Sequence, residues 1–257
     1  MLTKYLISWF TSIDHIFKVF KQHTLDYKDK SKRRIYIDNG GKVLFVAHLD
    51  TVQTPRYYWR SHNRIYAAGL DDRLGCWLAH TLSRELGADL LLTDNEECTM
   101  STAEYHVCKD YNWIVEFDRA GADVVTYDLD STEFRAALIE HFTIGIGLFS
   151  DLAFLDTSAC CVNIGIGHND RHDKNGYVDL SIMYSQVNRF KQFYQKYADT
   201  KFIRDQQPEV KLWPTEESES PIWVFCDCCC GYYPLSEMCY YSDSLVCQDC
   251  VYDLVPK

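Results

Sequence analysis

The chain has 257 residues, 47% of them hydrophobic, and a formal net charge of −11. This length suits one sizeable domain with a small appendage, and the hydrophobic content suffices for a packed core. The acidic charge argues against binding DNA or RNA through phosphates. No stretch approaches the roughly 20 apolar residues of a membrane span, so we expect no membrane partner either.

The first 20 residues carry apolar side chains at helical spacing, at Leu6, Phe10, Ile13, Phe17 and Phe20. This pattern predicts one amphipathic helix that packs on the domain. A signal peptide and a membrane-surface helix are the alternatives. Charged residues interrupt the apolar run and no small-residue cleavage site follows, which argues against a signal peptide.

The next elements follow from turn chemistry and hydrophobic periodicity. The turn Asn39-Gly40-Gly41 predicts a β-hairpin over residues 35–50. We then expect a helix over 72–86, a strand over 89–93, a short helix from Ser101 to about 110, strands over 113–117 and 123–127, a helix over 131–141, a strand over 161–167 and a long helix over 180–199. This alternation predicts an α/β fold, a mixed, mostly parallel sheet flanked by helices on both faces.

A composition boundary follows residue 205. Residues 205–221 are polar and acidic and contain three prolines, which is typical of a linker. We therefore expect a main domain over 1–205, a linker over 206–221 and a small module over 222–257. Residues 207–257 include two basic and nine acidic residues, so they carry −7 of the chain's net charge of −11.

Seven of the 12 cysteines lie after residue 225. Two CxxC pairs, Cys226 with Cys229 and Cys247 with Cys250, have the spacing of a four-cysteine zinc site. We expect a zinc-ribbon or treble-clef module held by one structural Zn, with disulfides as the alternative. Its negative charge disfavours a nucleic-acid finger and leaves a protein-docking role open. The scattered remaining cysteines are typical of a reducing compartment, so we expect a cytoplasmic protein.

Five segments rich in acidic residues and histidine each come at or just after a short apolar run of strand type. They are VAHLDTV with His48 and Asp50, GLDDRLG with Asp71, TDNEEC with Glu96 and Glu97, VEFDRAG with Asp118, and NDRHDKNGYVDL with His172. An open α/β sheet presents functional side chains at its strand ends. Oxygen and nitrogen ligands gathered there bind divalent metals, so the pattern predicts a metal-dependent hydrolase.

The order HxD, DD, EE, D, H resembles that of the co-catalytic dinuclear zinc exopeptidases, which include bacterial aminopeptidases, peptidase T and related amidohydrolases. The resemblance covers about residues 40–200, and HLDTV and the adjacent glutamates are its most specific pieces. It implies two catalytic Zn ions, with Co or Mn as substitutes, and hydrolysis of a peptide or amide bond.

The resemblance also implies five metal ligands: His48 and Asp118 on one ion, Glu97 and His172 on the other, and Asp71 as the bridge between them. Asp50 would orient the His48 imidazole. Glu96 would be the general base that passes a proton to the leaving amine. His168, four residues before His172, is the alternative ligand, and we favour His172.

The chain departs from peptidase T and its closest relatives, which insert a lid domain between the fourth and fifth motifs. Only 54 positions separate Asp118 from His172, too few for a lid of roughly 100 residues. The lid residues that bind substrate in those relatives are therefore absent, and a lidless aminopeptidase is the closer analogue. Asn175-Gly176 stands where relatives often carry Glu. Arg119, beside Asp118, either points away from the site or contacts substrate.

We therefore expect an aminopeptidase-like exopeptidase that acts on small peptides. An amidohydrolase that cleaves an N-acyl amino acid is the alternative within enzymes. The alternative from another class is a catalytically silent, zinc-dependent interaction protein that docks a partner through its C-terminal module. The intact Glu96 argues against that third interpretation.

Overall fold

The computed structural model describes residues 2–98, 100–147, 150–169 and 175–205, together with four short strands between residues 223 and 247. The chain divides into two compact units, Met1–Gln206 and Gln207–Lys257. No helix among the described residues is long and apolar enough to cross a membrane.

A seven-stranded mixed sheet forms the centre of the first unit. Its strands are β1 (Thr24–Leu25), β2 (Arg34–Ile37), β3 (Val43–His48), β6 (Asp89–Thr93), β7 (Trp113–Glu116), β8 (Val124–Val125) and β9 (Cys160–Ile164). They are arranged in the order β1-β2-β6-β3-β7-β9-β8, and the four strands from β6 to β9 run parallel. Every residue of these four strands is buried, as expected for parallel strands covered on both faces.

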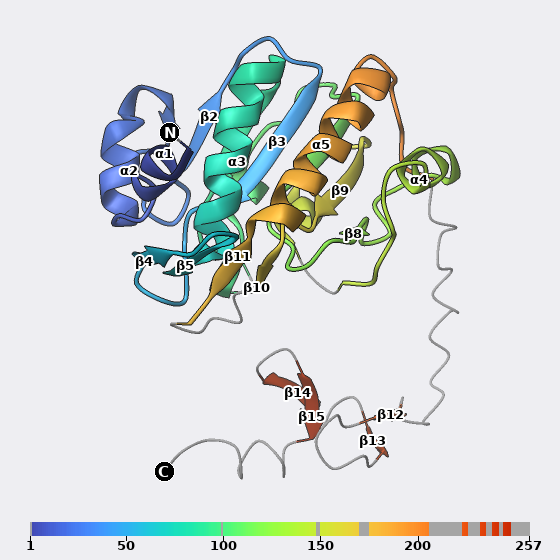
Figure 1. The fold of residues 1–257 in the computed structure, drawn as a ribbon. Helices are drawn as coiled ribbons and strands as arrows, with labels where there is room; N and C mark the ends of the chain where they lie inside the picture. Colours follow the sequence, from blue (N-terminus) through green and yellow to red (C-terminus); the bar gives the residue numbers. More distant parts are fainter. Residues whose placement is uncertain are drawn as a thin grey trace. The chain divides into compact units, whose positions relative to one another are not determined.

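Helices flank this sheet, which confirms the predicted fold class. The α-helices are α1 (Leu2–Ile7), α2 (Ile13–Val19), α3 (Leu70–Leu86), α4 (Thr132–Ile139) and α5 (Leu180–Tyr197). They pack into one core with Phe45 and Ala47 of β3, and α3 and α5 lie along the sheet (Figure 1). Leu44 and Val46 point to the opposite face, where the 3-10 helices η3 (Thr102–Tyr105) and η4 (Asp151–Phe154) cover them.

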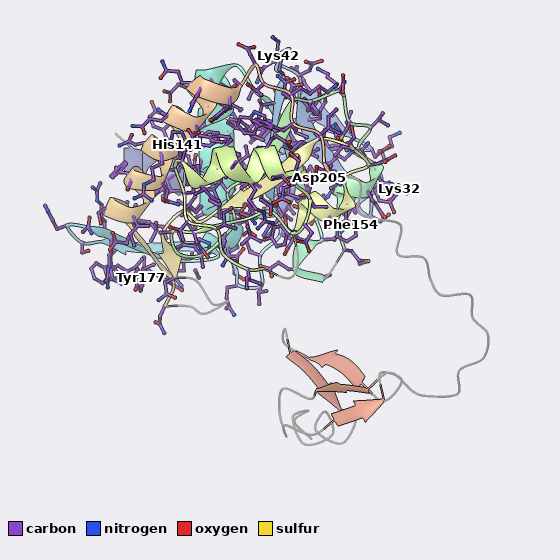
Figure 2. The ribbon with its side chains drawn as sticks, turned by 90° about the vertical axis from the view of Figure 1, so that its right-hand side faces the viewer. Lys32, Lys42, His141, Phe154, Tyr177 and Asp205 are labelled. Carbon is purple, nitrogen blue, oxygen red and sulfur yellow. The ribbon has the colours of Figure 1, made fainter. Side chains whose placement is uncertain are left out.

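A second, smaller sheet consists of β4 (Arg56–Arg60), β5 (Arg64–Ala68), β10 (His168–Asn169) and β11 (Tyr177–Asp179), in the order β10-β11-β5-β4. It lies at the end of the main sheet where β3 finishes (Figure 1). Figure 2 shows Lys42, just before β3, and Tyr177 of β11 at opposite ends of this unit. The GLDDRLG segment therefore follows a strand of the smaller sheet, while three other motifs follow strands of the main sheet.

The predicted hairpin over residues 35–50 is wrong. The turn forms, with Gly40 at a φ of 72°, but β2 and β3 do not pair with each other. Strand β6 lies between them, antiparallel to β2 and parallel to β3. The turn is instead fastened to β6, because the Asp89 carboxylate accepts the backbone N–H groups of Asn39 and Gly41 at 2.8 and 2.9 Å.

The prediction of a single N-terminal helix is also wrong, because the structure has two short helices there. Ser12 begins the second, α2, and its hydroxyl accepts the backbone N–H of His15 at 3.3 Å. Ser131 caps α4 as expected. Ser101 caps the short η3 rather than a helix that continues to about residue 110. The other predicted helices and strands are found within a few residues of their expected bounds.

The second unit contains two strand pairs, β12 (Trp223–Phe225) with β13 (Tyr232–Pro234), and β14 (Met238–Tyr241) with β15 (Ser244–Cys247). Cys247 is the last residue of β15. Cys226, Cys229 and Cys250, the other predicted ligands of the structural Zn, lie outside the described residues.

Candidate metal centre

Three parallel strands end side by side at one edge of the main sheet. His48, the last residue of β3, pairs with Thr93, the last residue of β6, and β7 ends on the other side of β3. Parallel strands present their carboxyl ends at the same edge, so the segments that follow them meet there. These segments carry Asp50, Glu96 and Asp118.

Carboxylates surround the fully buried imidazole of His48. Its Nε2 atom lies 3.2 Å from Oδ1 of Asp71, 3.4 Å from Oδ1 of Asp118 and 3.8 Å from Oε2 of Glu96. The ligand atoms of His48, Asp71 and Asp118 all lie within 4.8 Å of one another. These three residues could therefore hold one metal ion.

Asp50 lies on the other side of the same imidazole. Nδ1 of His48 is 3.1 Å from the Asp50 carbonyl oxygen and 3.5 Å from its Oδ1. The Asp50 carboxylate also accepts the backbone N–H groups of Glu96 at 3.2 Å and Glu97 at 3.0 Å. A proton on Nδ1 would leave the Nε2 lone pair free, the form in which an imidazole can bind a metal.

The first turn of α3 brings Asp71 to the centre and sends its neighbour inward. Asp72 is fully buried, and its Oδ1 accepts the backbone N–H of Gly75 at 2.9 Å. A Cβ at residue 75 would lie 2.1 Å from that oxygen and 2.3 Å from the carbonyl oxygen of Phe117. Glycine at this position therefore lets α3 approach the segment that carries Asp118.

Glu97 follows Glu96 in the 3-10 helix η2 (Glu96–Cys98). Its Oε1 accepts the backbone N–H of Val52 at 3.3 Å, from the loop after β3. Glu97 thus joins the loop of the first motif to the third motif.

The crowding of charges shifts the protonation of these groups. Burial, with added repulsion from Asp118, raises the pKa of Glu96 to about 8. Burial, with added repulsion from Asp71, also raises the pKa of Asp118. Burial would lower the pKa of His48, but the neighbouring carboxylates of Asp118, Asp50 and Asp71 outweigh it and hold that pKa well above its usual value. A divalent cation would remove this repulsion between carboxylates.

The donor atoms fit such a cation. Nε2 of His48 and Oδ1 of Asp118 are buried and lack a hydrogen-bond partner within the described part of the chain. One imidazole nitrogen and several carboxylate oxygens form a ligand set that zinc accepts. His172, the predicted ligand of the second ion, lies outside the described residues. The alternative, His168, has its Nε2 2.6 Å from the carbonyl oxygen of Asp118, so this nitrogen is engaged by the backbone.

Arg119 forms a two-pronged ion pair away from the carboxylate cluster. Its Nε and Nη2 each lie 2.7 Å from a carboxylate oxygen of Asp123. Ser150 caps η4, because its hydroxyl accepts the backbone N–H of Leu152 at 3.2 Å. Of the two alternatives for Arg119, the structure therefore shows the one in which its side chain points away from the carboxylates.

Three further buried acids lie near the centre and are not among the metal ligands predicted from the sequence: Asp72, Glu116 and Asp151. Glu116 accepts hydrogen bonds from the Ser150 hydroxyl and from Nδ2 of Asn163. A glutamate inside the apolar run WIVEF is the signal that could have identified it, because charged residues are rarely buried without a partner or a function.

No known family model matches this chain, and no curated protein is similar to it in sequence. Solved structures do resemble it. The aminopeptidase PepT from Bacillus cereus matches with a TM-score of 0.51 and 10% identity, over 75% of this chain and 96% of that chain. A tripeptidase from Staphylococcus aureus matches with a TM-score of 0.53 and 10% identity, over 77% of this chain and 98% of that chain. The main unit therefore has the fold of these two peptidases.

Proposed function

We propose that this protein is a dizinc hydrolase that removes the N-terminal residue from small peptides. The observation that carries the proposal is the convergence of His48, Asp71 and Asp118, whose ligand atoms lie within 4.8 Å of one another. They meet at the carboxyl edge of a sheet, and the same fold is found in two solved peptidases.

In this proposal five residues hold the metals: His48 and Asp118 on one ion, Glu97 and His172 on the other, and Asp71 on both. Two divalent ions, Zn or in its place Co or Mn, would polarise the scissile carbonyl and lower the pKa of the attacking water. Asp50 keeps the His48 ring oriented through Nδ1, which supports ligation by the opposite nitrogen.

Glu96 has the position expected of a proton carrier. Its Oε2 lies 3.8 Å from His48 Nε2, beside the ligands Asp71 and Asp118. As a carboxylate it takes a proton from the attacking water and delivers it to the leaving amine. Its pKa of about 8 before metal binding would fall next to two cations, which would keep it ionised near neutral pH.

The test is Glu96→Gln, which keeps the shape of the side chain and removes the proton acceptor. We expect hydrolysis of an aminoacyl substrate to fall by ~10²–10⁴-fold while the bound metal is unchanged. Glu104→Gln, an exposed glutamate of η3, is the matched control and should keep full activity. If Glu96→Gln keeps more than half of the wild-type rate, the role proposed for Glu96 as proton carrier is wrong.

A substrate panel separates the alternatives. Free dipeptides, N-blocked dipeptides and N-acyl amino acids should be tested with added Zn, Co or Mn. Cleavage that requires a free N-terminus supports the exopeptidase, and cleavage of N-acyl amino acids alone supports an amidohydrolase. A protein that binds metal and cleaves none of them would be the silent interaction protein.

We further propose that residues 222–257 form a module held by one structural Zn on Cys226, Cys229, Cys247 and Cys250. The five cysteines described in the first unit are free thiols, which supports a reducing, cytoplasmic environment. The module would serve as a docking surface for a protein partner or as an appendage without activity.

A further inference from the structure

The proposed metal ligand Asp118 lies in a segment without regular structure. Strand β7 ends at Glu116, two residues earlier, and neither a helix nor a strand continues through residues 117–121. A side chain in such a segment keeps a fixed direction only if other parts of the protein hold its backbone. Residues 163–168, from the end of β9 to the start of β10, supply hydrogen bonds to this segment.

The buried side chain of Asn163 holds the N–H side of Asp118. Asn163 lies opposite Glu116 on the neighbouring parallel strand. Its Oδ1 accepts the backbone N–H groups of Asp118 at 3.1 Å and Arg119 at 3.0 Å. Its Nδ2 donates to Oε2 of Glu116 at 2.9 Å and to the hydroxyl oxygen of Tyr127 at 3.2 Å. An amide turned by 180° would set its own N–H groups against two backbone N–H groups, so only this orientation satisfies every partner.

The buried imidazole of His168 holds the carbonyl side of Asp118. Its Nε2 lies 2.6 Å from the Asp118 carbonyl oxygen. A carbonyl oxygen can only accept, so this nitrogen carries a proton and donates it. Its lone pair is therefore not available to a metal, which gives His168 a different task from the ligand role considered for it.

Backbone hydrogen bonds join the same two segments just beyond Asp118. The N–H of Ile166 donates to the carbonyl oxygen of Arg119 at 3.0 Å, and the N–H of Gly167 donates to that of Gly121 at 2.8 Å. These bonds keep the segment after β9 next to the segment after β7. The side chains of Asn163 and His168 therefore reach Asp118 from a fixed support.

We propose that Asn163 and His168 are positioning residues for the metal ligand Asp118. Their side chains engage both its N–H and its carbonyl group, so they set the direction in which its carboxylate points toward His48. A ligand that is already ordered loses less conformational freedom when it binds an ion, which strengthens binding. The inference rests on the proposed metal centre and adds two residues outside its ligand set.

The test is calorimetric titration of the full chain with Mn²⁺ after dialysis against a chelator. Mn²⁺ prefers carboxylate ligands to thiolates, so the predicted four-cysteine site should contribute little to the signal. Asn163→Ala and His168→Leu should each weaken Mn²⁺ binding about tenfold or more, as is typical when a metal ligand loses its supporting partner. His168→Gln should bind more tightly than His168→Leu, because its amide can still donate to the Asp118 carbonyl.

Asn112→Ala is the matched control for a purely structural effect. Asn112 directly precedes β7, at the end of the strand opposite Asp118, and its Nδ2 donates to the carbonyl oxygen of Ala198 at 2.7 Å. Its replacement should lower the stability of the fold and leave the affinity for Mn²⁺ unchanged. Urea unfolding of every variant measures the stability and so separates it from positioning.

The inference is overturned if Asn163→Ala and His168→Leu bind Mn²⁺ as the wild type does. It is equally overturned if Asn112→Ala weakens binding as much as they do, because affinity would then follow stability. Should Asn163→Ala fail to fold, the two His168 variants decide, and equal affinities in them count against the inference. A wild-type chain that binds no Mn²⁺ would overturn the metal centre together with the inference. A chain that binds Mn²⁺ but cleaves no peptide would contradict the proposed activity alone.

Discussion

His48 Nε2 has oxygens of Asp71, Asp118 and Glu96 within 3.8 Å. All three carboxylates are largely shielded from solvent, so their mutual repulsion is weakly screened. The same arrangement that disfavours the ionised metal-free site favours a cation in it. We therefore expect these acids to stabilise the centre by binding a metal rather than by ordinary ion pairing.

In the proposed two-ion arrangement, Asp71 is the ligand that bridges both metals. Asp71→Ala should lower occupancy at both metal positions, because a bridging carboxylate contributes to each ion. Glu97→Ala should empty mainly one. Elemental analysis of the purified full chain measures this, with Asp110→Ala, an exposed aspartate paired with Lys201, as the control. Metal retained by Asp71→Ala at the wild-type level would remove Asp71 from the ligand set.

The proximity of His48, Asp50, Glu96 and Asp118 could be predicted from the sequence. Each lies at or after the end of a predicted strand, and parallel strands end at the same edge of a sheet. The direction of a side chain was harder to predict. Asp71 and Asp72 are adjacent and chemically identical, yet Asp71 faces His48 and Asp72 is enclosed against Gly75. Which of two such neighbours turns inward depends on packing that is distant in the chain.

At the scale of elements, the start of β6 carries a buried carboxylate with many donors. Asp89 accepts from the backbone N–H groups of Asn39 and Gly41, from the hydroxyls of Tyr36 and Tyr111, and from Lys109. Burial opposes its ionisation, but these hydrogen bonds outweigh burial and hold the pKa of Asp89 below its usual value. The network joins β2, its turn and β6.

Replacing Asp89 tests how much this network contributes to the stability of the fold. We expect Asp89→Asn to lower the free energy of unfolding at pH 7 by about 2 kcal/mol or more, because donors are left unpaired. The folded-state pKa is depressed, so this stabilisation is present above the unfolded pKa of about 4 and disappears as pH falls through the folded value. Urea unfolding from pH 7 to pH 3 measures it.

The exposed neighbour Asp38 supplies the control for that series. It also contacts Lys109, at 2.5 Å, but surface ion pairs contribute about 1 kcal/mol or less. Asp38→Asn should therefore change stability little at any pH. A similar loss in both variants would place the stabilisation in Lys109 rather than in Asp89.

Strand β6, which begins at Asp89, explains why the hairpin prediction failed. Asn39-Gly40-Gly41 has correct turn chemistry, and turn chemistry is local information. Strand pairing was decided by DLLLT at residues 89–93, which is apolar enough to be buried on both faces and enters between the two flanking strands. No feature of residues 35–50 reveals that third strand.

At the scale of the whole molecule, the first unit contains its own sheet, both cores and every described residue of the proposed centre. A chain that ends at residue 205 should therefore fold, bind two metals and hydrolyse small substrates. It should contain one zinc fewer than the full chain, because a closed four-thiolate site is structural. Zinc content and steady-state rates of both chains measure this. A folded, metal-loaded but inactive truncation would mean that residues 206–257 take part in the reaction.

The position of β6 between β2 and β3 also sets an order of events during synthesis. Residues 34–48 leave the ribosome well before residues 89–93. Until β6 emerges, β2 and β3 lack the strand that lies between them, because they do not pair with each other. Such unpaired apolar edges favour association between nascent chains. Pairing has to wait for contacts across more than 40 positions of chain, and long-range pairing of this kind slows folding. The emergence of DLLLT is thus the earliest moment at which the centre of the sheet can close.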